Sequence, residues 1–282
     1  MNPADEYILK LSCEDQPGIV AAVSRVIAEN NGNITECQQF EDHETGRFLM
    51  RVVFRSKDIE RTRFHLAPVI ERFALDHELV PRKQRGRVLI MASNSDHCLH
   101  DLLYRWKKGN LNMDIVGIVS NHDVARPMAE SYGIEYDLLP VTKENKARQE
   151  QALKGIIDER QVELIILARY MQILSDQIAN GLYGRVINIH HSFLPSFKGA
   201  RPYHQAHHRG VKLIGATAHY VTPDLDEGPI IEQEVARVKH SDTADDLVRI
   251  GRDVESRVLA RAVTWHLDHR VFLNDAKTVV FN

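Results

Sequence analysis

The chain has 282 residues, 43% of them hydrophobic, and its 36 Lys and Arg against 39 Asp and Glu leave a formal net charge of −3. This length suits a medium-sized domain joined to a smaller one, with enough apolar residues for sizeable cores. The near-neutral charge offers no broad attraction for nucleic acid, so we expect no nucleic-acid partner. The first residues lack a signal-peptide pattern and no apolar run approaches the length of a membrane span, so we expect a cytoplasmic protein with no membrane partner.

The number and spacing of the cysteines argue against a disulfide-rich protein and against a cysteine-based zinc site. Cys13, Cys37 and Cys98 are widely separated and odd in number. This spacing suits neither a disulfide framework nor a zinc site built from paired ligands. We expect reduced thiols.

The first 83 residues follow the hydrophobic pattern of a small α/β domain. The pattern predicts, in order, a strand over 7–12, a helix over 19–28, strands over 34–40 and 48–54, a helix over 61–73 and a short strand at 79–80. A polar turn, Asp15-Gln16-Pro17-Gly18, separates the first strand from the first helix. The order βαββαβ predicts a ferredoxin-like domain.

A charged stretch over residues 81–86 predicts a linker, which divides the chain into domains 1–83 and 84–282. Beyond it, the pattern alternates between strands and helices. The predicted elements are strands over 87–92, 115–119, 162–167, 184–187 and 213–221, a helix with apolar residues from Leu99 to Trp106, a helix from about Asp123, and a closing helix over 243–265. This alternation predicts an α/β fold with a doubly wound, mostly parallel sheet.

Polar side chains follow two of these strands. Asn188 and His190 open the cluster N-I-H-H-S-F-L-P-S-F-K-G, in which Pro195 and Gly199 stop regular structure, and Asp226 follows the strand over 213–221. Ligands of open α/β sheets bind outside the carboxyl ends of strands. Each residue alone is more commonly structural, but together they offer an amide, an imidazole and a carboxylate at one site.

The pattern N-I-H-x-S-x-L-P from Asn188, followed by H-x-V-x-x-x-x-D-x-G-P from His219, resembles the signature of the folate-dependent formyltransferase family. The resemblance covers about residues 86–270 and implies that Asn188, His190 and Asp226 are the catalytic trio. It also implies that the segment 167–175 lines a pterin pocket, where backbone groups suit the polar edge of the ring. The implied substrate-binding residues are Met171, Gln172, Ile173, Leu174, His219 and Gly228.

The family's common reaction is attack on the formyl carbon of 10-formyltetrahydrofolate. Asn188 and a protonated His190 suit the negative charge that develops on the formyl oxygen, and Asp226 suits holding His190 protonated and taking the nucleophile's proton. The chemistry requires no cofactor and no metal, since the folate is the substrate. The histidines at 204, 207 and 208 have no carboxylate or cysteine at ligand spacing, and we expect them on a helix surface.

The acceptor is suggested by a departure from the family pattern. Ribonucleotide transformylases carry a glycine-rich phosphate loop after the first strand of this domain, whereas residues 91–96 here read M-A-S-N-S-D. The loop disfavours a ribonucleotide and the net charge disfavours tRNA, which leaves water. The chain resembles the family's 10-formyltetrahydrofolate hydrolases, in which a small ferredoxin-like domain precedes the formyltransferase-like domain. His191 also fits this branch, because the transformylases have proline there. The implied products are formate, supplied to purine biosynthesis, and tetrahydrofolate. Transfer to an amine, or an amino-acid-responsive regulator that binds folate without turnover, stay open as alternatives.

The first domain, with D-x-P-G between its first strand and helix, resembles an ACT domain. That family commonly binds amino acids between paired domains, which implies an effector site at Asp15, Gln16, Pro17 and Gly18. The alternative is that these residues form only a turn and that the domain serves assembly. In either case ACT pairing predicts a homo-oligomer.

Overall fold

The structure is a computed structural model that describes residues 5–192 and 202–282. It divides into two compact units. The first holds the chain up to Gln84 together with Asp268–Asn274 and Val279–Asn282, and the second holds Arg85–Leu267 and Asp275–Thr278. Among the described residues, no helix has the length and apolar character that crossing a membrane requires. All three cysteines are free, as expected.

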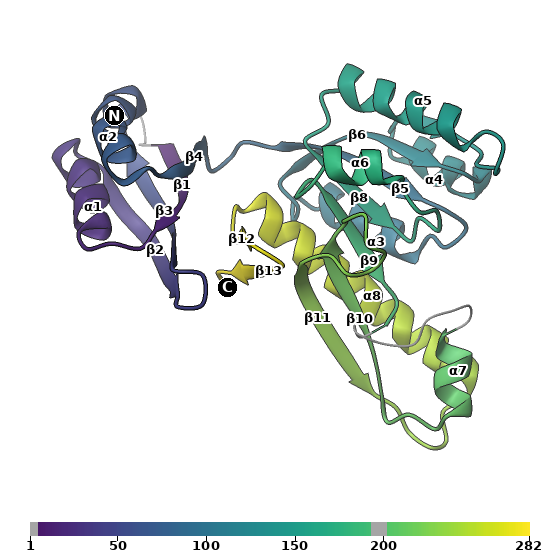
Figure 1. The fold of residues 1–282 in the computed structure, drawn as a ribbon. Helices are drawn as coiled ribbons and strands as arrows, with labels where there is room; N and C mark the ends of the chain where they lie inside the picture. The colour runs from purple at the N-terminus through teal and green to yellow at the C-terminus, as the bar shows by residue number, and fades with distance from the viewer. Residues whose placement is uncertain (1–4, 193–201) are drawn as a thin grey trace. The chain divides into compact units, whose positions relative to one another are not determined.

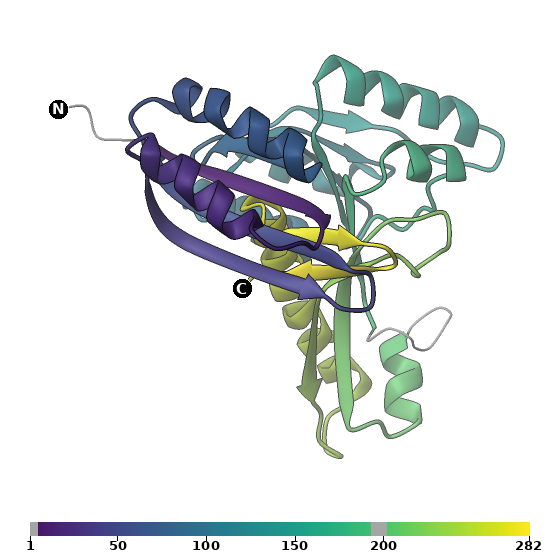
Figure 2. The ribbon, with the colours of Figure 1, turned by 60° about the vertical axis from the view of Figure 1, so that its left-hand side comes forward.

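The first unit is built on a four-stranded antiparallel sheet. Its elements are β1 (Asp5–Glu14), α1 (Ile19–Glu29), β2 (Asn33–Asp42), β3 (Arg47–Ser56), α2 (Ile59–Phe73) and β4 (Asp76–Pro81). The strand order is β2-β3-β1-β4. Helices α1 and α2 lie side by side on one face of this sheet (Figure 2). The βαββαβ order that the sequence predicts is confirmed.

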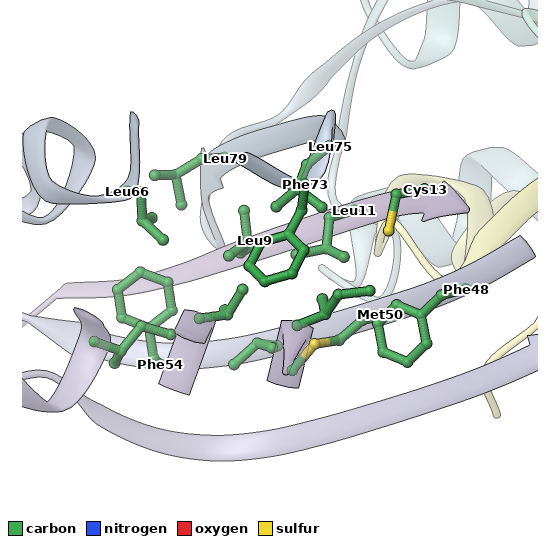
Figure 3. Packing of buried hydrophobic residues seen from close by; sticks show 14 residues of the cluster. Leu9, Leu11, Cys13, Phe48, Met50, Phe54, Leu66, Phe73, Leu75 and Leu79 are labelled. Carbon is green, nitrogen blue, oxygen red and sulfur yellow. The ribbon is translucent and has the colours of Figure 1, made fainter. Parts of the chain in front are cut away.

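The core of the first unit lies between that face of the sheet and the two helices. Leu9 and Leu11 share one face of β1 because strand side chains alternate, while Val23 and Ile27 recur four residues apart on α1. These side chains are almost completely buried, together with Phe73 at the end of α2. Figure 3 shows how the side chains interdigitate across β1 and β3. The alternation of the sequence therefore decides which face of the sheet is covered by helices.

The end of the chain returns to this unit and packs on the other face of the sheet, to which the alternate side chains of β3 point. β12 (Val271–Asn274) and β13 (Lys277–Val280) form a hairpin, and Phe272 and Phe281 cluster with Leu49 of β3. Arg51, only 1% exposed, donates from Nε to the carbonyl of Asp268 at 3.0 Å. The predicted boundary left this return out, because nothing in the local pattern of the last residues says which distant strand they cover.

The second unit is built on a seven-stranded sheet. Its elements are β5 (Gly86–Ala92), α3 (His97–Lys107), β6 (Met113–Ser120), η1 (Asp123–Ala125), α4 (Arg126–Ser131), β7 (Tyr136–Leu138), α5 (Lys146–Glu159), β8 (Leu164–Ala168), α6 (Asp176–Gly181), β9 (Val186–His190), α7 (Pro202–His208), β10 (Leu213–Tyr220), β11 (Ile230–Arg237) and α8 (Ala244–Leu267). The strand order is β11-β10-β9-β8-β5-β6-β7. Strands β5 to β9 are parallel, whereas β10 runs antiparallel to both its neighbours.

Helices pack against both the parallel strands and the antiparallel strands of this sheet. Leu153 of α5 and Ile178 of α6 pack against Leu89 and Leu167, while α8 runs along β10 and β11 and packs against α3 and α7 (Figure 1). The chain adds β6 and β7 on one side of β5 and then β8 and β9 on the other. The strand order thus reverses between β5 and β8, and the carboxyl ends of the strands at such a reversal are the usual ligand site of such sheets. The doubly wound fold class is confirmed.

Some elements differ from the predicted ones. The strand predicted to stop at Ile187 continues as β9 to His190, because Asn188 and His190 keep pairing with β10 despite their polar side chains. The helix predicted from Asp123 begins as a 3-10 turn. Helices α5 and α6 and strands β7, β11, β12 and β13 were not predicted from the pattern. α5 carries few apolar residues among charged ones, and β11 is largely half-buried or exposed.

Candidate active site

Two antiparallel strands place the predicted amide and imidazoles together. Asn188 lies opposite His219 across β9 and β10, and His190 lies opposite Thr217. Directly paired residues have side chains on the same face of a sheet, and positions two apart share that face. Asn188, His190 and His219 therefore point to one side. The sequence predicted that two strand ends would meet, whereas the strands run in opposite directions and the groups meet along the pair.

The loop after β10 folds back to bring Asp226 to the histidines. Asp226 Oδ2 lies 3.3 Å from His190 Nδ1, and its Oδ1 lies 3.6 Å from His219 Nε2. Hydrogen bonds from His190 and His219 hold the pKa of the Asp226 carboxyl well below its usual range, against the opposing effect of burial. The carboxylate is therefore anionic at neutral pH and faces two imidazoles. Its backbone is left-handed, with φ 58°, a conformation that Asp tolerates better than most residues.

Gly228 allows this return of the loop. A Cβ at this position would lie 1.8 Å from the carbonyl oxygen of Tyr220. The chain closes there with a hydrogen bond from Tyr220 N to Pro229 O at 2.9 Å. Gly228 is buried and its visible task is close backbone packing, in addition to any contact with substrate that the sequence predicts.

His219 is fixed by bonds on both sides of its ring. Its Nδ1 lies 2.9 Å from the carbonyl oxygen of Tyr220, which only accepts, so Nδ1 carries a proton. Its Nε2 lies 3.2 Å from Nδ2 of Asn188 and 3.6 Å from Asp226 Oδ1, so it accepts from the amide when the ring is neutral and donates to the carboxylate when the ring is protonated. The ring is only 2% exposed. The neutral ring of His219 thus orients the side-chain amide of Asn188, which has a second N–H to donate.

The loop between β8 and α6 carries the predicted pterin-pocket residues. Met171 and Ile173 are 58% and 57% exposed, which is high for apolar side chains at the carboxyl end of a strand. Gln172 is half-buried, whereas Leu174 packs into the core with α5 and α6. The structure therefore leaves three of the four side chains within reach of a ligand and takes Leu174 into the core.

A hydrogen bond ties this loop to the end of β5. The backbone N–H of Met171 donates to Ser93 Oγ at 3.0 Å, and Ser93 donates to Asn121 at 2.6 Å. The backbone at Met171 is thereby tied to the carboxyl end of β5, where the strand order reverses. Pro195 and Gly199 of the cluster after β9 lie outside the described residues.

Beside His190 lies a buried polar network that the sequence did not predict. The rings of His190 and His191 stack at 5.1 Å with an interplanar angle of 24°. Adjacent residues within a strand point to opposite faces, but β9 ends at His190, so this alternation does not extend to His191. Arg169 contacts His191 Nδ1 and pairs with Glu255 of α8 at 3.2 Å. A glutamate inside a helix's apolar face was the available signal for this network.

One set of side chains in the described part of the chain has the spacing of a metal site. The ligand atoms of His97, Cys98 and Glu255 lie within 4.8 Å of one another. The Glu255 carboxylate is already paired with Arg169, and burial raises the pKa of the Cys98 thiol far above its ordinary value. A buried cation and a protonated thiol both oppose metal binding, so these residues suit a cation poorly. The histidines at 204, 207 and 208 lie on α7 with their side chains exposed.

The predicted effector residues form the exposed turn between β1 and α1. Asp15, Gln16, Pro17 and Gly18 are all exposed. Gly18 stands at the N-cap of α1 with φ 99° and without a side-chain capping bond. The first N–H groups of α1 therefore have no capping side chain of the chain's own.

Matches to known families agree with the division of the chain into two units. A formyl transferase family model matches residues 86–263, and an ACT domain model matches residues 7–63. A formyltetrahydrofolate deformylase of Synechocystis is 47% identical over 97% of both chains. The crystal structure of a formyltetrahydrofolate deformylase from Burkholderia mallei superposes with a TM-score of 0.95 at 49% identity, covering 99% of this chain and all of that one.

The chain belongs to the formyltetrahydrofolate deformylase family. The likeness to this family includes the first unit as well as the second. A phosphoribosylglycinamide formyltransferase from Anaplasma phagocytophilum, 29% identical with a TM-score of 0.64, covers only 71% of this chain although 96% of its own length is matched. Membership of the deformylase family therefore extends over the whole chain, whereas the likeness to the transferase leaves more than a quarter of the chain unmatched.

Proposed function

We propose that this chain hydrolyses 10-formyltetrahydrofolate to formate and tetrahydrofolate. The observation that supports this most is the contact of Asp226 with both His190 and His219, beside Asn188, in a chain whose whole length matches formyltetrahydrofolate deformylases. An anionic carboxylate, two imidazoles and an amide are the groups that addition of water to a formyl carbon requires.

The reaction forms a C–O and an N–H bond and breaks a C–N and an O–H bond, with no change of oxidation state. The water oxygen bonds to the formyl carbon, and the bond from that carbon to the folate nitrogen breaks. The nitrogen takes a proton that originates from the water, and the formyl group leaves as formic acid, which ionises to formate. Negative charge develops on the formyl oxygen during the addition and needs hydrogen-bond donors.

Asn188, His190 and Asp226 divide these tasks. The free N–H of Asn188 and a protonated His190 donate to the developing oxyanion, each preorganised donor being worth about 3 to 4 kcal/mol. Asp226 keeps its charge, because its hydrogen bonds with the two histidines lower its pKa, and its position beside His190 suits it to accept the proton of the water. His219 holds Asn188 in place through its Nε2.

The folate binds along the loop between β8 and α6. The exposed side chains of Met171 and Ile173 offer apolar contact to the pterin ring. The backbone around Met171, fixed by Ser93, offers polar groups to the edge of the ring. Gln172 is the polar side chain of the same loop. The reaction uses no metal and no cofactor.

In the cell, this reaction supplies formate to purine biosynthesis and sets the balance of the one-carbon folate pool. Both roles follow from the products and from a cytoplasmic location. The first unit adds regulation and assembly. An amino acid binds at the turn formed by Asp15, Gln16, Pro17 and Gly18, where the N–H groups of α1 donate to its carboxylate. The edge strands β2 and β4 are available for pairing with the same unit of a second copy.

The experiment that tests the hydrolysis is formate release from the purified protein and 10-formyltetrahydrofolate, with no acceptor added. Formate and tetrahydrofolate in equal amounts over many turnovers support hydrolysis. Tetrahydrofolate that forms only after an amine such as glycinamide ribonucleotide is added, with no release of formate, supports a transferase. Folate binding without release supports a regulator. An amino-acid panel in the same assay and in thermal unfolding tests the effector, which fails if neither activity nor melting temperature changes.

A further inference from the structure

A buried network of polar side chains borders His190 and has no part in the chemistry described above. It consists of His191, Arg169, Glu255, Tyr203 and His97, from five separate segments of the second unit. Its inner end is His191, whose ring stacks on that of His190. Such a network is costly unless its members are satisfied, and this one is tied to a proposed reaction centre.

The contact between Arg169 and His191 decides where the proton of His191 lies. Arg169 Nη1 meets Nδ1 of His191, and a guanidinium has donors only. Nδ1 must therefore accept, and the proton of the neutral ring lies on Nε2. Burial, followed by the charge of Arg169 and the neighbouring His190, lowers the pKa of His191 to about 4. His191 is therefore a neutral ring with one N–H to donate.

Arg169 is itself held in position by Glu255. The carboxylate of Glu255 is 1% exposed and lies 3.2 Å from Arg169 Nε. It also accepts from Tyr203 Oη at 2.6 Å and meets His97 Nε2 at 2.9 Å. Burial acts against the charge of Glu255, but these bonds and the Arg169 charge lower its pKa overall. Arg169 cannot swing away without leaving a buried carboxylate short of its cation.

Two backbone features preserve this arrangement. Arg169 has φ 62°, the left-handed region that costs about 1 kcal/mol or more for a residue of this kind. Gly251 in the middle of α8 leaves room for the Tyr203 ring, since a Cβ there would lie 2.1 Å from Cζ. The chain keeps an unfavourable dihedral at one end of the network and a helix glycine at the other.

We propose that His191 holds the attacking water by donating its Nε2–H to the water oxygen, and that Arg169 and Glu255 are positioning residues that keep this proton on Nε2. Asn188 and His190 serve the formyl oxygen and Asp226 takes a proton of the water, so the water still needs a contact that fixes its oxygen. His191 supplies that contact and gives up no proton in the step. The inference rests on the proposed hydrolysis.

The charges that surround His191 determine how it titrates. Arg169 from the end of β8 and His190 from β9 disfavour a second proton on the ring, while Glu255 from α8 and Asp226 from the loop after β10 favour one. Tyr203 of α7 faces it with ring centroids 6.3 Å apart, and His97 of α3 lies beyond Glu255. Because burial and Arg169 prevail, the ring stays neutral through the neutral pH range, and the contact with Arg169 keeps its single proton on Nε2.

The first test compares two substitutions at one position. His191→Phe keeps a ring without a donor, and His191→Gln keeps an amide N–H in place of Nε2–H. We expect His191→Phe to lower kcat for formate release about 100-fold, as loss of one preorganised donor does, with little change in the KM for the folate. His191→Gln should retain about a tenth of wild-type kcat or more. Equal losses in both variants, or a loss that appears only in KM, would overturn the inference. His100→Gln, at an exposed histidine of α3 outside the network, is the control and should match the wild type.

The second test separates water positioning from structural support. Arg169→Gln replaces a side chain that only donates to His191 Nδ1 by an amide that can also accept, so the neutral ring can carry its proton on Nδ1 and kcat should fall, whereas Arg169→Lys keeps a donor and should retain more of the wild-type kcat. The fall in kcat caused by Arg169→Gln should vanish when residue 191 is already changed by His191→Gln, because that side chain has no ring tautomers. An unchanged kcat in Arg169→Gln, or a fall of the same size in the double variant, would contradict the role of His191.

These outcomes also distinguish the two proposals. If the wild-type protein releases no formate without an amine, the proposed hydrolysis fails. If the wild type releases formate and His191→Phe does so equally fast, the hydrolysis stands and the role of His191 alone fails.

Discussion

Asp226 is the residue on which the proposed chemistry most depends, since it is the only carboxylate in contact with both His190 and His219 among the described residues. Asp226→Asn removes the group that takes the proton of the water. We expect kcat for formate release to fall between about 100-fold and 10,000-fold, the usual contribution of a general base. The KM for the folate should change little, because Asp226 acts on the water.

The same substitution should leave the fold intact. Asn is about as tolerant of the left-handed backbone as Asp, so φ 58° carries little extra cost in the variant. Thermal unfolding of the variant provides the control. Full turnover in a folded Asp226→Asn protein would exclude the carboxylate as the base.

His191 makes a separate prediction about stability and pH. Its pKa is lowered to about 4 in the folded protein, whereas an unfolded histidine titrates near about 6.5. Between these values the unfolded chain binds a proton that the folded chain does not, so stability falls as the pH drops through this window. Across this window the free energy of unfolding of the wild type should fall by at most about 3 kcal/mol more than that of His191→Gln. The difference is smaller to the extent that solvent screens the partly exposed ring. Urea unfolding at a series of pH values measures the difference; parallel curves would mean that the ring does not titrate abnormally.

At the residue scale, the motif was enough to bring Asn188, His190, His219 and Asp226 into one group, and their catalytic roles remain predictions. It could not reveal Arg169 or Glu255. Each belongs to a segment whose pattern is explained by a strand end or a helix, and only the tertiary fold makes them neighbours. Leu174 shows that a motif can also group residues that the fold separates. Residues 171–174 share one predicted role, but Met171 and Ile173 are exposed and Leu174 lies in the core.

At the scale of elements, α8 offers a test of how a helix accommodates the network. Gly251→Ala places a methyl group 2.1 Å from Tyr203 Cζ, so the ring must move and its hydroxyl must leave Glu255. Alanine is the better helix former by about 1 kcal/mol, yet overpacking costs about 1 to 3 kcal/mol. We expect net destabilisation in urea unfolding, together with a fall in kcat.

The matched control is Gly155→Ala in α5, where a Cβ meets nothing within 4 Å. It should stabilise the protein by about 0.5 to 1 kcal/mol because only helix propensity changes. If both alanine substitutions stabilise the protein, Gly251 is not needed to seat Tyr203.

The strands show which elements a pattern can reveal. Buried parallel strands such as β5 and β8 read as short apolar runs and were predicted closely. β11 was not, because it lies at the edge of the sheet and alternates weakly. The antiparallel course of β10 also escaped prediction, since strand direction depends on the connection through α7 and not on the residues of the strand.

At the scale of the molecule, the chain begins and ends in the same compact unit. Phe272 and Phe281 cover Leu49 on the sheet face away from α1 and α2, so the last residues complete the first unit. Phe272→Ala should cost about 3 to 5 kcal/mol in that unit. Phe64→Ala, at a side chain that is 75% exposed, should change stability by no more than about 0.5 kcal/mol.

The tryptophans give this prediction a specific readout. Trp106 and Trp265 are the only two in the chain, and both lie in the second unit. Loss of the first unit in Phe272→Ala should therefore appear in far-UV circular dichroism before it appears in tryptophan fluorescence. Coincident transitions in the variant at an unchanged midpoint would contradict the packing role of the hairpin.

The fold class and the order of the two units were predictable because local periodicity and two motifs point to the same architecture, and the family comparisons confirm both. The return of the last residues to the first unit was not predictable. Arg51, buried at 1% exposure, takes its partner from Asp268, more than two hundred residues away. A long-range pair of this kind leaves no trace in a local pattern.

The measurement that most directly tests the account is the isotopic composition of formate produced from 10-formyltetrahydrofolate in water enriched in oxygen-18, with no amine present. If water attacks the formyl carbon at the site formed by Asn188, His190 and Asp226, each formate takes one of its two oxygens from water, and the fraction of formate that carries oxygen-18 should equal the enrichment of the water. Tetrahydrofolate should appear in equal amount, and Asp226→Asn should suppress both. Absence of labelled formate from the wild-type protein would contradict the hydrolysis and point to an amine as the true acceptor.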